Sequence, residues 1–129
     1  MKNKYGNRRF FKDGENWDSA KEYNRYQELL LLQRAGQISC LARQVEYELI
    51  PQQVETTPRY HKRTGERIKD HVKVLEESCK YIADFVYVDE NGEIVVEDVK
   101  GYRKGEAYRV FVIKRKLMLY VHGVRIREV

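Results

Sequence analysis

The sequence lacks any apolar run of the roughly 20 residues that a membrane-spanning helix needs. Its first segment, residues 1–12, is basic but has neither an apolar stretch nor a small-residue cleavage site, so no signal peptide is predicted. These two absences argue against membrane and secreted proteins. We expect a cytoplasmic protein with no membrane partner.

Cysteine and histidine, the usual ligands of zinc, are also scarce. The two cysteines, Cys40 and Cys79, have no zinc-type spacing, and we interpret them as free, buried small side chains. The three histidines, His61, His71 and His122, form no ligand pattern either. A zinc site and a disulfide framework are therefore not expected.

The positive charge is modest in total but unevenly placed. Lys and Arg number 25 against 20 Asp and Glu, in a chain of 129 residues whose length fits a single domain. Basic residues outnumber acidic ones in three segments, 1–12, 59–73 and 100–116. One such segment is usually a solvated surface, but three on a small domain favour a nucleic-acid phosphate backbone as the partner.

Residue patterns predict a mixed α/β sheet, in the order helix, three strands, helix, strand. After an irregular basic arm over 1–16, Asp18 or Ser19 caps a helix that runs to about Ala35 and stops at Gly36. The further predicted elements are strand 44–50, a charged insertion over 51–79 with a short helix or a hairpin, strands 80–88 and 93–100, helix 107–122 and a last strand over 124–129.

Acidic residues lie within two of these strands, in rows that are otherwise apolar. Side chains alternate along a strand, so Asp84 lies in one such row and Asp98 and Lys100 lie in the next. Glu97, by the same alternation, points to the opposite face from Lys100. A charge in an apolar row is costly unless it is paired or bound to a metal. The apolar members of the two rows are Ile82, Val86, Val88, Ile94 and Val96.

The turn between the two strands decides whether the carboxylates meet. A two-residue turn ending at Gly92 would place Asp84 opposite Val99, with the two acids on different faces. A three-residue loop over 90–92, with Gly92 in the left-handed position, places Asp84 directly opposite Asp98, with Cβ atoms about 5 Å apart. Only this register puts both apolar rows on one side of the hairpin. We therefore predict the three-residue loop.

Two such carboxylates repel each other unless a cation lies between them. Mg²⁺ prefers one or two carboxylates together with waters and substrate phosphate. Lys100 points to the same place and can hold a water or a phosphate, although a structural ion pair on the sheet face is the alternative. Glu22, on the inward face of the first helix, is a third candidate acid. Its alternative role is a capping box with Ser19.

A helix Glu22, a strand Asp84 and an Asp98-x-Lys100 strand, in this order, resemble the PD-(D/E)XK nuclease superfamily. The resemblance implies a restriction-endonuclease-like core of helix, three strands with a hairpin, helix and strand. Local strings also resemble a small phage and prophage family, the domain of unknown function family 1064. The strings are WDSAKEYNRY (17–26), YIADFVY (81–87), VVEDVKG (95–101) and IREV (126–129). The resemblance covers most of 17–50 and 80–129 and leaves 51–79 unsupported.

The superfamily resemblance assigns roles by position. It implies Glu22, Asp84, Asp98 and Lys100 as catalytic residues. It implies Mg²⁺ or Mn²⁺ as the cofactor, held by the three acids and the backbone carbonyl of Val99. Ala83 stands where the motif often has proline, a departure that the superfamily tolerates because only the Asp binds metal. Tyr102, Arg103 and Lys104 directly follow the motif and are candidates to hold DNA phosphates. Gln44 and Lys114 are possible substrate contacts, with a structural role as the alternative for both.

The implied activity is hydrolysis of DNA phosphodiester bonds, leaving a 3′-hydroxyl and a 5′-phosphate. Branched DNA in phage recombination or replication is the candidate substrate, a homodimer the candidate assembly and a bacterial host cell the setting. No small-molecule cofactor is expected. Fold does not fix function, so two alternatives stay open: a catalytically inactive DNA-binding or assembly module on the same fold, and a ribonuclease.

Overall fold

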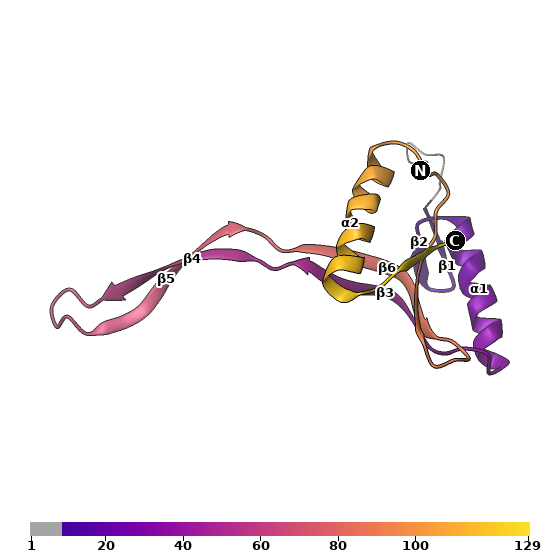
Figure 1. The fold of residues 1–129 in the computed structure, drawn as a ribbon, viewed down its shortest axis with the longest axis horizontal. Coiled ribbons are helices and arrows are strands. Elements are labelled where there is room, and N and C mark those ends of the chain that lie inside the picture. The colour runs from indigo at the N-terminus through magenta and orange to yellow at the C-terminus, as the bar shows by residue number, and fades with distance from the viewer. Residues whose placement is uncertain (1–8) are drawn as a thin grey trace. The chain divides into compact units, whose positions relative to one another are not determined.

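The computed structural model describes residues 9–129 and has the predicted α/β class, with two helices and a mixed sheet (Figure 1). The elements in chain order are β1 (Phe10–Lys12), β2 (Glu15–Trp17), α1 (Ala20–Arg34), β3 (Ser39–Ile50), β4 (Gln53–Tyr60), β5 (Arg67–Glu76), β6 (Cys79–Val88), β7 (Ile94–Asp98), α2 (Glu106–His122) and β8 (Ile126–Glu128). No helix in this part of the chain is long and apolar enough to span a membrane.

The central sheet has four strands in the order β3-β6-β7-β8. β6 and β7 pair antiparallel, whereas β7 and β8 pair parallel. This mixed arrangement is compatible with a restriction-endonuclease-like core. The parallel strand β8 follows α2 in sequence, as a crossover connection requires.

The chain divides into two compact units. The second unit, Glu48–Lys80, contains the predicted insertion, and the remaining described residues form the first. Of the two structures expected for the insertion, the hairpin is present: β4 and β5 pair antiparallel, from Gln53 opposite Glu76 to Tyr60 opposite Arg67.

Helix α1 has the predicted ends. The Oγ of Ser19, the N-cap, accepts a hydrogen bond from the backbone N–H of Glu22 at 3.1 Å. Gly36 follows the C-cap residue with a φ of +77°, a left-handed conformation that glycine adopts without penalty. The inward face of α1 packs on the sheet, with the ring of Tyr26 stacked on that of Phe85 at a centroid distance of 5.9 Å.

The β6–β7 loop confirms the predicted register. The Asp89 N–H donates to the Glu93 carbonyl at 2.9 Å, and the Gly92 N–H donates to the Asp89 carbonyl at 3.1 Å, which leaves three residues in the loop. Gly92 has a φ of +78°, as a type I turn followed by a bulge demands. Val86 faces Val96 across the ladder.

Both faces of the β6–β7 hairpin carry buried residues. The core cluster beneath α1 contains Phe85 and Tyr87 of β6, with Leu29 and Ile38. In the rows that hold Asp84 and Asp98, Val96 is 1% exposed, whereas Ile82 is 47% exposed. Both rows of β6 are apolar, so alternation alone could not choose between them. The large aromatic rings fill the space under the helix and decide the matter.

Three local expectations need correction. Within the arm expected to be irregular, residues 10–17 form the hairpin β1–β2, while the rest of that arm, up to residue 8, lies outside the described residues. Strand β3 begins at Ser39 instead of residue 44. Cys40 and Gln44 have positive φ angles, which interrupt the alternation of side chains, so the residue pattern did not reveal the first part of the strand. Both cysteines are free as expected, but Cys40 is exposed and Cys79 only partly buried.

Candidate active site

The two strand aspartates meet where β6 and β7 separate. The last paired residues are Phe85 and Glu97, and the same register places Asp84 opposite Asp98 one residue further on. The Oδ2 of Asp84 accepts a hydrogen bond from the Val99 N–H at 2.8 Å. This side chain therefore satisfies a backbone donor that the β6 ladder no longer reaches.

On its other edge, β7 remains tied to the C-terminal strand. The Val129 N–H donates to the Asp98 carbonyl at 3.0 Å, and the Lys100 N–H donates to the Val129 carbonyl at 3.0 Å. The backbone from Asp98 to Lys100 is thereby held on both sides. A rigid segment of this kind is what a site needs to keep its side chains in position.

Burial and mutual repulsion govern the charge of the aspartate pair. Loss of solvent, followed by the charges of Asp98 and Glu22, raises the pKa of Asp84 to about 8, although the Val99 N–H partly opposes the shift. Without a cation, Asp84 therefore retains a proton near neutral pH. A divalent ion between the carboxylates would replace that proton.

Lys100 lies directly beside Asp98. Its Nζ is 2.5 Å from the Oδ2 of Asp98 and 3.5 Å from the ring centroid of Phe111 on α2. Apart from this ion pair, Asp98 Oδ2 is buried without a hydrogen-bond partner in the described part of the chain. The Lys21 ammonium donates to the Lys100 carbonyl at 2.6 Å and fixes the backbone from the side of α1.

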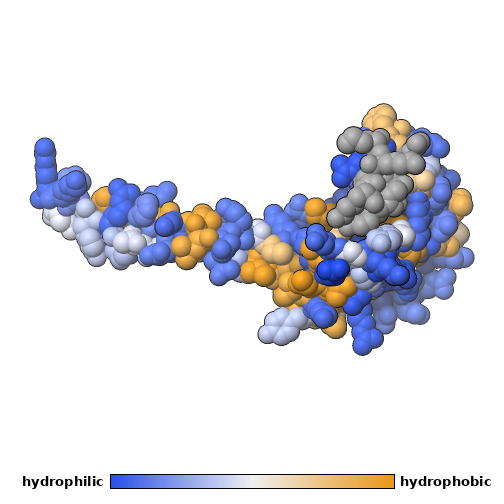
Figure 2. Space-filling model, turned by 90° about the horizontal axis from the view of Figure 1, so that it is seen from above, coloured by the Kyte–Doolittle hydropathy of each residue, from blue (hydrophilic) through white to orange (hydrophobic). Residues whose placement is uncertain are grey.

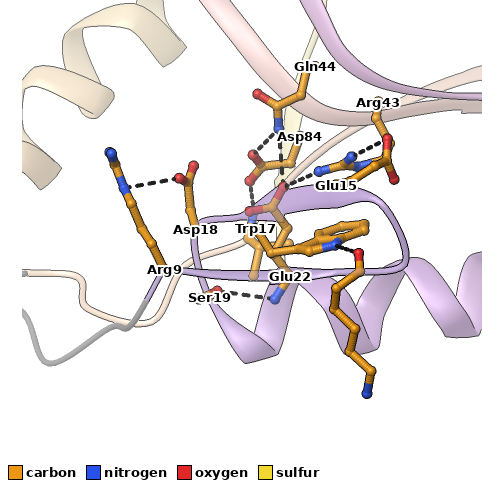
Figure 3. Close-up of polar contacts among 11 residues, drawn as sticks. Arg9, Glu15, Trp17, Asp18, Ser19, Glu22, Arg43, Gln44 and Asp84 are labelled. Atoms are coloured by element: carbon orange, nitrogen blue, oxygen red, sulfur yellow. Dashed lines mark hydrogen bonds and ion pairs between the residues drawn. The ribbon is translucent and has the colours of Figure 1, made fainter. Parts of the chain in front are cut away.

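Gln44 links the aspartate pair to the helix acid (Figure 3). Its Nε2 donates to the Glu22 carboxylate at 3.1 Å and to the Oδ1 of Asp84 at 3.4 Å. Gln44 has a φ of +52°, which is uncommon for a residue with a side chain and is found disproportionately at functional sites. The Gln44 side chain thus places its amide between two acids.

Glu22 is 3% exposed and turns into the site. Its backbone N–H uses Ser19 as a cap, so half of the predicted capping box forms. The carboxylate contacts Gln44 and forms an ion pair with Arg43 at 3.5 Å. Burial, followed by the charge of Asp18, raises the pKa of Glu22, and Arg43 lowers it. The Gln44 amide therefore connects the carboxylate of Glu22 to that of Asp84.

Three residues near the acids were missed by sequence reasoning. Arg43 lies over the ring of Trp17 at 3.6 Å and forms an ion pair with Glu15 at 3.0 Å. Tyr81 has a buried hydroxyl near Asp98, and burial, followed by the charges of Asp98 and Asp84, raises its pKa. Lys21, which holds the Lys100 carbonyl, is the third. Each contact joins distant segments and left no motif to detect.

Glu97 lies away from this site, as alternation predicts. It is fully buried and pairs with the Arg25 guanidinium through bonds of 2.8 and 2.7 Å. It also accepts a short hydrogen bond from the Tyr87 hydroxyl. Glu97 is therefore a structural acid beneath α1.

The predicted substrate residues are placed differently from one another. Tyr102 and Lys104 line a cavity of about 140 Å³ next to Lys100. Arg103 is exposed on the same loop. Lys114 is half-buried and lies on the α2 face that also bears Phe111, three residues before it. Tyr102 and Lys104 therefore lie near the site, because they share this cavity with Lys100. Among the described residues, no contact links Arg103 or Lys114 to the aspartates.

The aspartate pair fits a hard divalent cation. No group of three or more His, Cys, Asp or Glu side chains in residues 9–129 is arranged to hold a metal. Mg²⁺ needs only one or two carboxylates, because waters and substrate phosphate complete its shell. The adjacent carboxylates of Asp84 and Asp98 meet that requirement, and the Lys100 ammonium is ion-paired to the Oδ2 of Asp98. Roles for Glu22 and the Val99 carbonyl as metal ligands stay predictions.

The comparisons with known proteins give a family but no activity. A family model described as "Protein of unknown function (DUF1064)" matches residues 2–127. The chain belongs to the DUF1064 family. No curated protein and no solved structure matches it. The DUF1064 match includes the hairpin over 51–79, which local strings had left without support.

The raised pKa of Asp84 predicts how stability depends on pH in this DUF1064 protein. Its ordinary value is 3.8 and its folded value about 8, so between these values the folded state binds more protons than the unfolded chain. This contribution to stability is complete below about pH 4 and is lost as pH rises through 8. With chelator, we expect the melting temperature of wild type to fall more steeply between pH 5 and 8.5 than that of Asp84→Asn.

Thermal unfolding followed by circular dichroism tests this expectation in matched buffers. Saturating Mg²⁺ should stabilise wild type most at the alkaline end, where it no longer competes with the proton. Parallel pH profiles for wild type and Asp84→Asn would contradict the assignment.

Proposed function

We propose that this chain is a metal-dependent DNA endonuclease of the PD-(D/E)XK type. The observation that supports it most directly is the meeting of Asp84 and Asp98 from paired positions on adjacent strands, with Lys100 ion-paired to Asp98. Two buried carboxylates that repel each other lower the stability of the fold. Such an arrangement is typical of a site that binds a cation.

In this proposal Asp84 and Asp98 hold Mg²⁺ or Mn²⁺, aided by the Val99 carbonyl. When bound, such an ion polarises a phosphate and lowers the pKa of a coordinated water. Asp98 orients the Lys100 ammonium, which donates to the attacking water or to a phosphate oxygen as negative charge develops there. Gln44 fixes the Asp84 carboxylate and connects it to Glu22.

The proposed substrate is DNA, cut to leave a 3′-hydroxyl and a 5′-phosphate, with branched DNA of phage recombination or replication as the favoured form. Tyr102 and Lys104, at the cavity beside Lys100, would contact the strand that is cut, and Arg103, Lys114 and Gln44 would support it. A homodimer is part of the proposal. It is supported by an exposed apolar stripe on α2, made of Val110, Ile113, Tyr120 and Val121.

One observation favours the inactive module as the second candidate. The Lys100 ammonium lies against both Asp98 and the Phe111 ring, which is also how a purely structural ion pair would pack. In that case the basic surfaces would bind DNA and the acids would only maintain the fold. The two candidates differ in one measurable property, which is metal-dependent turnover.

A panel of labelled substrates tests the proposal. Four-way junctions, flaps, duplex DNA, single-stranded DNA and matched RNA are incubated with Mg²⁺, with Mn²⁺ and with chelator. We expect cleavage of at least one DNA form with metal and none with chelator, because the carboxylates alone cannot activate water. A ligase should seal the product only if it ends in a 5′-phosphate. Binding without cleavage of any form would overturn the enzyme proposal, and faster cutting of RNA would assign the ribonuclease.

A further inference from the structure

The β4–β5 hairpin ends in a group of exposed cations. Arg59 lies near the end of β4, Lys62 and Arg63 lie in the turn, and Arg67 and Lys69 lie at the start of β5. We call these five residues the tip cluster. Figure 2 shows hydrophilic side chains gathered at this end of the hairpin. None of the five has a role in the proposed active site.

The turn that bears the tip cluster is an ordered structure. The His61 N–H donates to the Glu66 carbonyl at 2.7 Å, and the Gly65 N–H donates to the His61 carbonyl at 2.9 Å. The Nδ1 of His61 accepts from the N–H groups of Arg63 and Thr64, both at 3.2 Å. The backbone under the cations is therefore fixed before any partner binds, which reduces the entropy lost on binding.

Most charges of the tip cluster are not neutralised within the chain. Arg67 forms an ion pair with Asp70 at 3.1 Å. Arg59, Lys62, Arg63 and Lys69 form no ion pair with any of residues 9–129. A polyanion could neutralise these four unpaired charges.

The shape of the hairpin favours a particular polyanion. It is a two-stranded antiparallel ribbon. The major groove of B-form DNA, about 12 Å wide, admits such a ribbon. The major groove of double-stranded RNA is too narrow and deep for side chains to read. The width of the ribbon therefore distinguishes the two duplexes.

We propose that the tip cluster binds the phosphate backbone of duplex DNA, with the hairpin in or along the major groove. The choice of DNA rests partly on the proposed nuclease function, but binding itself does not require cleavage. The hairpin would hold the duplex by contacts independent of sequence, which position a protein on DNA without specifying bases.

Neutralising the tip tests the proposal in the full-length protein. Fluorescence anisotropy with a labelled DNA duplex, in chelator, measures the dissociation constant over a range of salt concentrations. Each lost phosphate contact lowers the salt slope by about 0.9 and, at 0.1 M salt, weakens binding roughly eightfold. Lys62→Gln/Arg63→Gln should therefore bind at least about tenfold more weakly, with a visibly shallower slope.

Two matched variants control for net charge. Arg34→Gln/Arg125→Gln removes two exposed positive charges from the other compact unit and should bind within about twofold of wild type. Asp70→Asn releases the Arg67 guanidinium from its ion pair and should bind several-fold more tightly. Equal loss in both double variants would show a general charge effect and overturn the tip assignment.

The outcome is separable from that of the enzyme proposal. If the tip variant binds duplex DNA as wild type does, the inference is wrong whether or not the protein cuts. If the tip variant loses binding and no substrate is ever cut, the hairpin proposal stands and the nuclease proposal fails. Equal affinity of wild type for double-stranded RNA and DNA would overturn the groove geometry.

Discussion

Replacing Asp98 by Ala, or Lys100 by Ala, is expected to lower the rate of DNA cleavage by about 10³-fold or more. In the proposed mechanism Asp98 is one of the two metal-binding carboxylates, so its loss would remove both a metal ligand and the ion-pair partner of the Lys100 ammonium. Lys100 supplies positive charge where negative charge develops, and loss of one such group typically costs 10²- to 10³-fold. Single-turnover assays with excess enzyme measure the chemical step directly.

Packing and charge can be separated at this site. Asp98→Asn keeps the size of the side chain but removes its charge, and it should be nearly as inactive as Asp98→Ala. DNA affinity in chelator should not fall in either Asp98 variant, because the removed carboxylate repels phosphate. Glu93→Gln, an exposed acid on the same β6–β7 hairpin, and Lys116→Ala, an exposed lysine on α2, are the controls and should cut normally. Wild-type turnover by Asp98→Ala would refute the mechanism.

Replacing Arg25 by Ala is expected to lower the free energy of unfolding by about 3–5 kcal/mol, the largest stability effect that we predict. Glu97 is fully buried, and the Arg25 guanidinium pairs with both of its carboxylate oxygens. Removing this cation leaves a buried carboxylate that keeps the Tyr87 hydroxyl and a longer ion pair of 3.9 Å with the exposed Arg127. Breaking a buried pair in this way is far more costly than breaking one on the surface.

Equilibrium unfolding in urea measures the effect, and the same arginine provides its control. Arg25 also bonds the exposed Glu28 at 2.8 Å, and Glu28→Ala should cost under about 1 kcal/mol. The double variant Arg25→Met/Glu97→Met replaces the pair by apolar groups and should regain much of the loss. A cost below 1 kcal/mol for Arg25→Ala would show that Glu97 reaches solvent or takes up a proton at no expense.

Local signals made much of this fold predictable. The ends of α1 follow from Ser19 and Gly36, and the loop closed by Gly92 fixes the register that brings Asp84 and Asp98 together. Both depend on residues adjacent in sequence, whose conformational preferences are strong. The placement of Lys100 followed from the same register.

Tertiary contacts account for what could not be predicted. Two apolar rows on β6 left the core face undetermined until the rings of Phe85 and Tyr87 met α1. The positive φ of Gln44 has no sequence signature, so neither the start of β3 nor the link from Gln44 to Glu22 was foreseeable. Glu22 itself illustrates two roles for one residue, since its backbone N–H donates to the Ser19 cap and its carboxylate enters the site.

The stacking of Arg43 on Trp17 gives the protein an optical reporter of its own. Trp17 is the single tryptophan of the sequence. Its indole N–H donates to the Lys12 carbonyl at 3.1 Å, and the guanidinium above its ring also touches Glu22. Any event that redistributes charge around Glu22 will shift the guanidinium and thereby alter indole emission. If the proposed metal ion binds, we expect its occupancy to change the intrinsic fluorescence of the unlabelled wild-type chain, without a dye or a competing substrate.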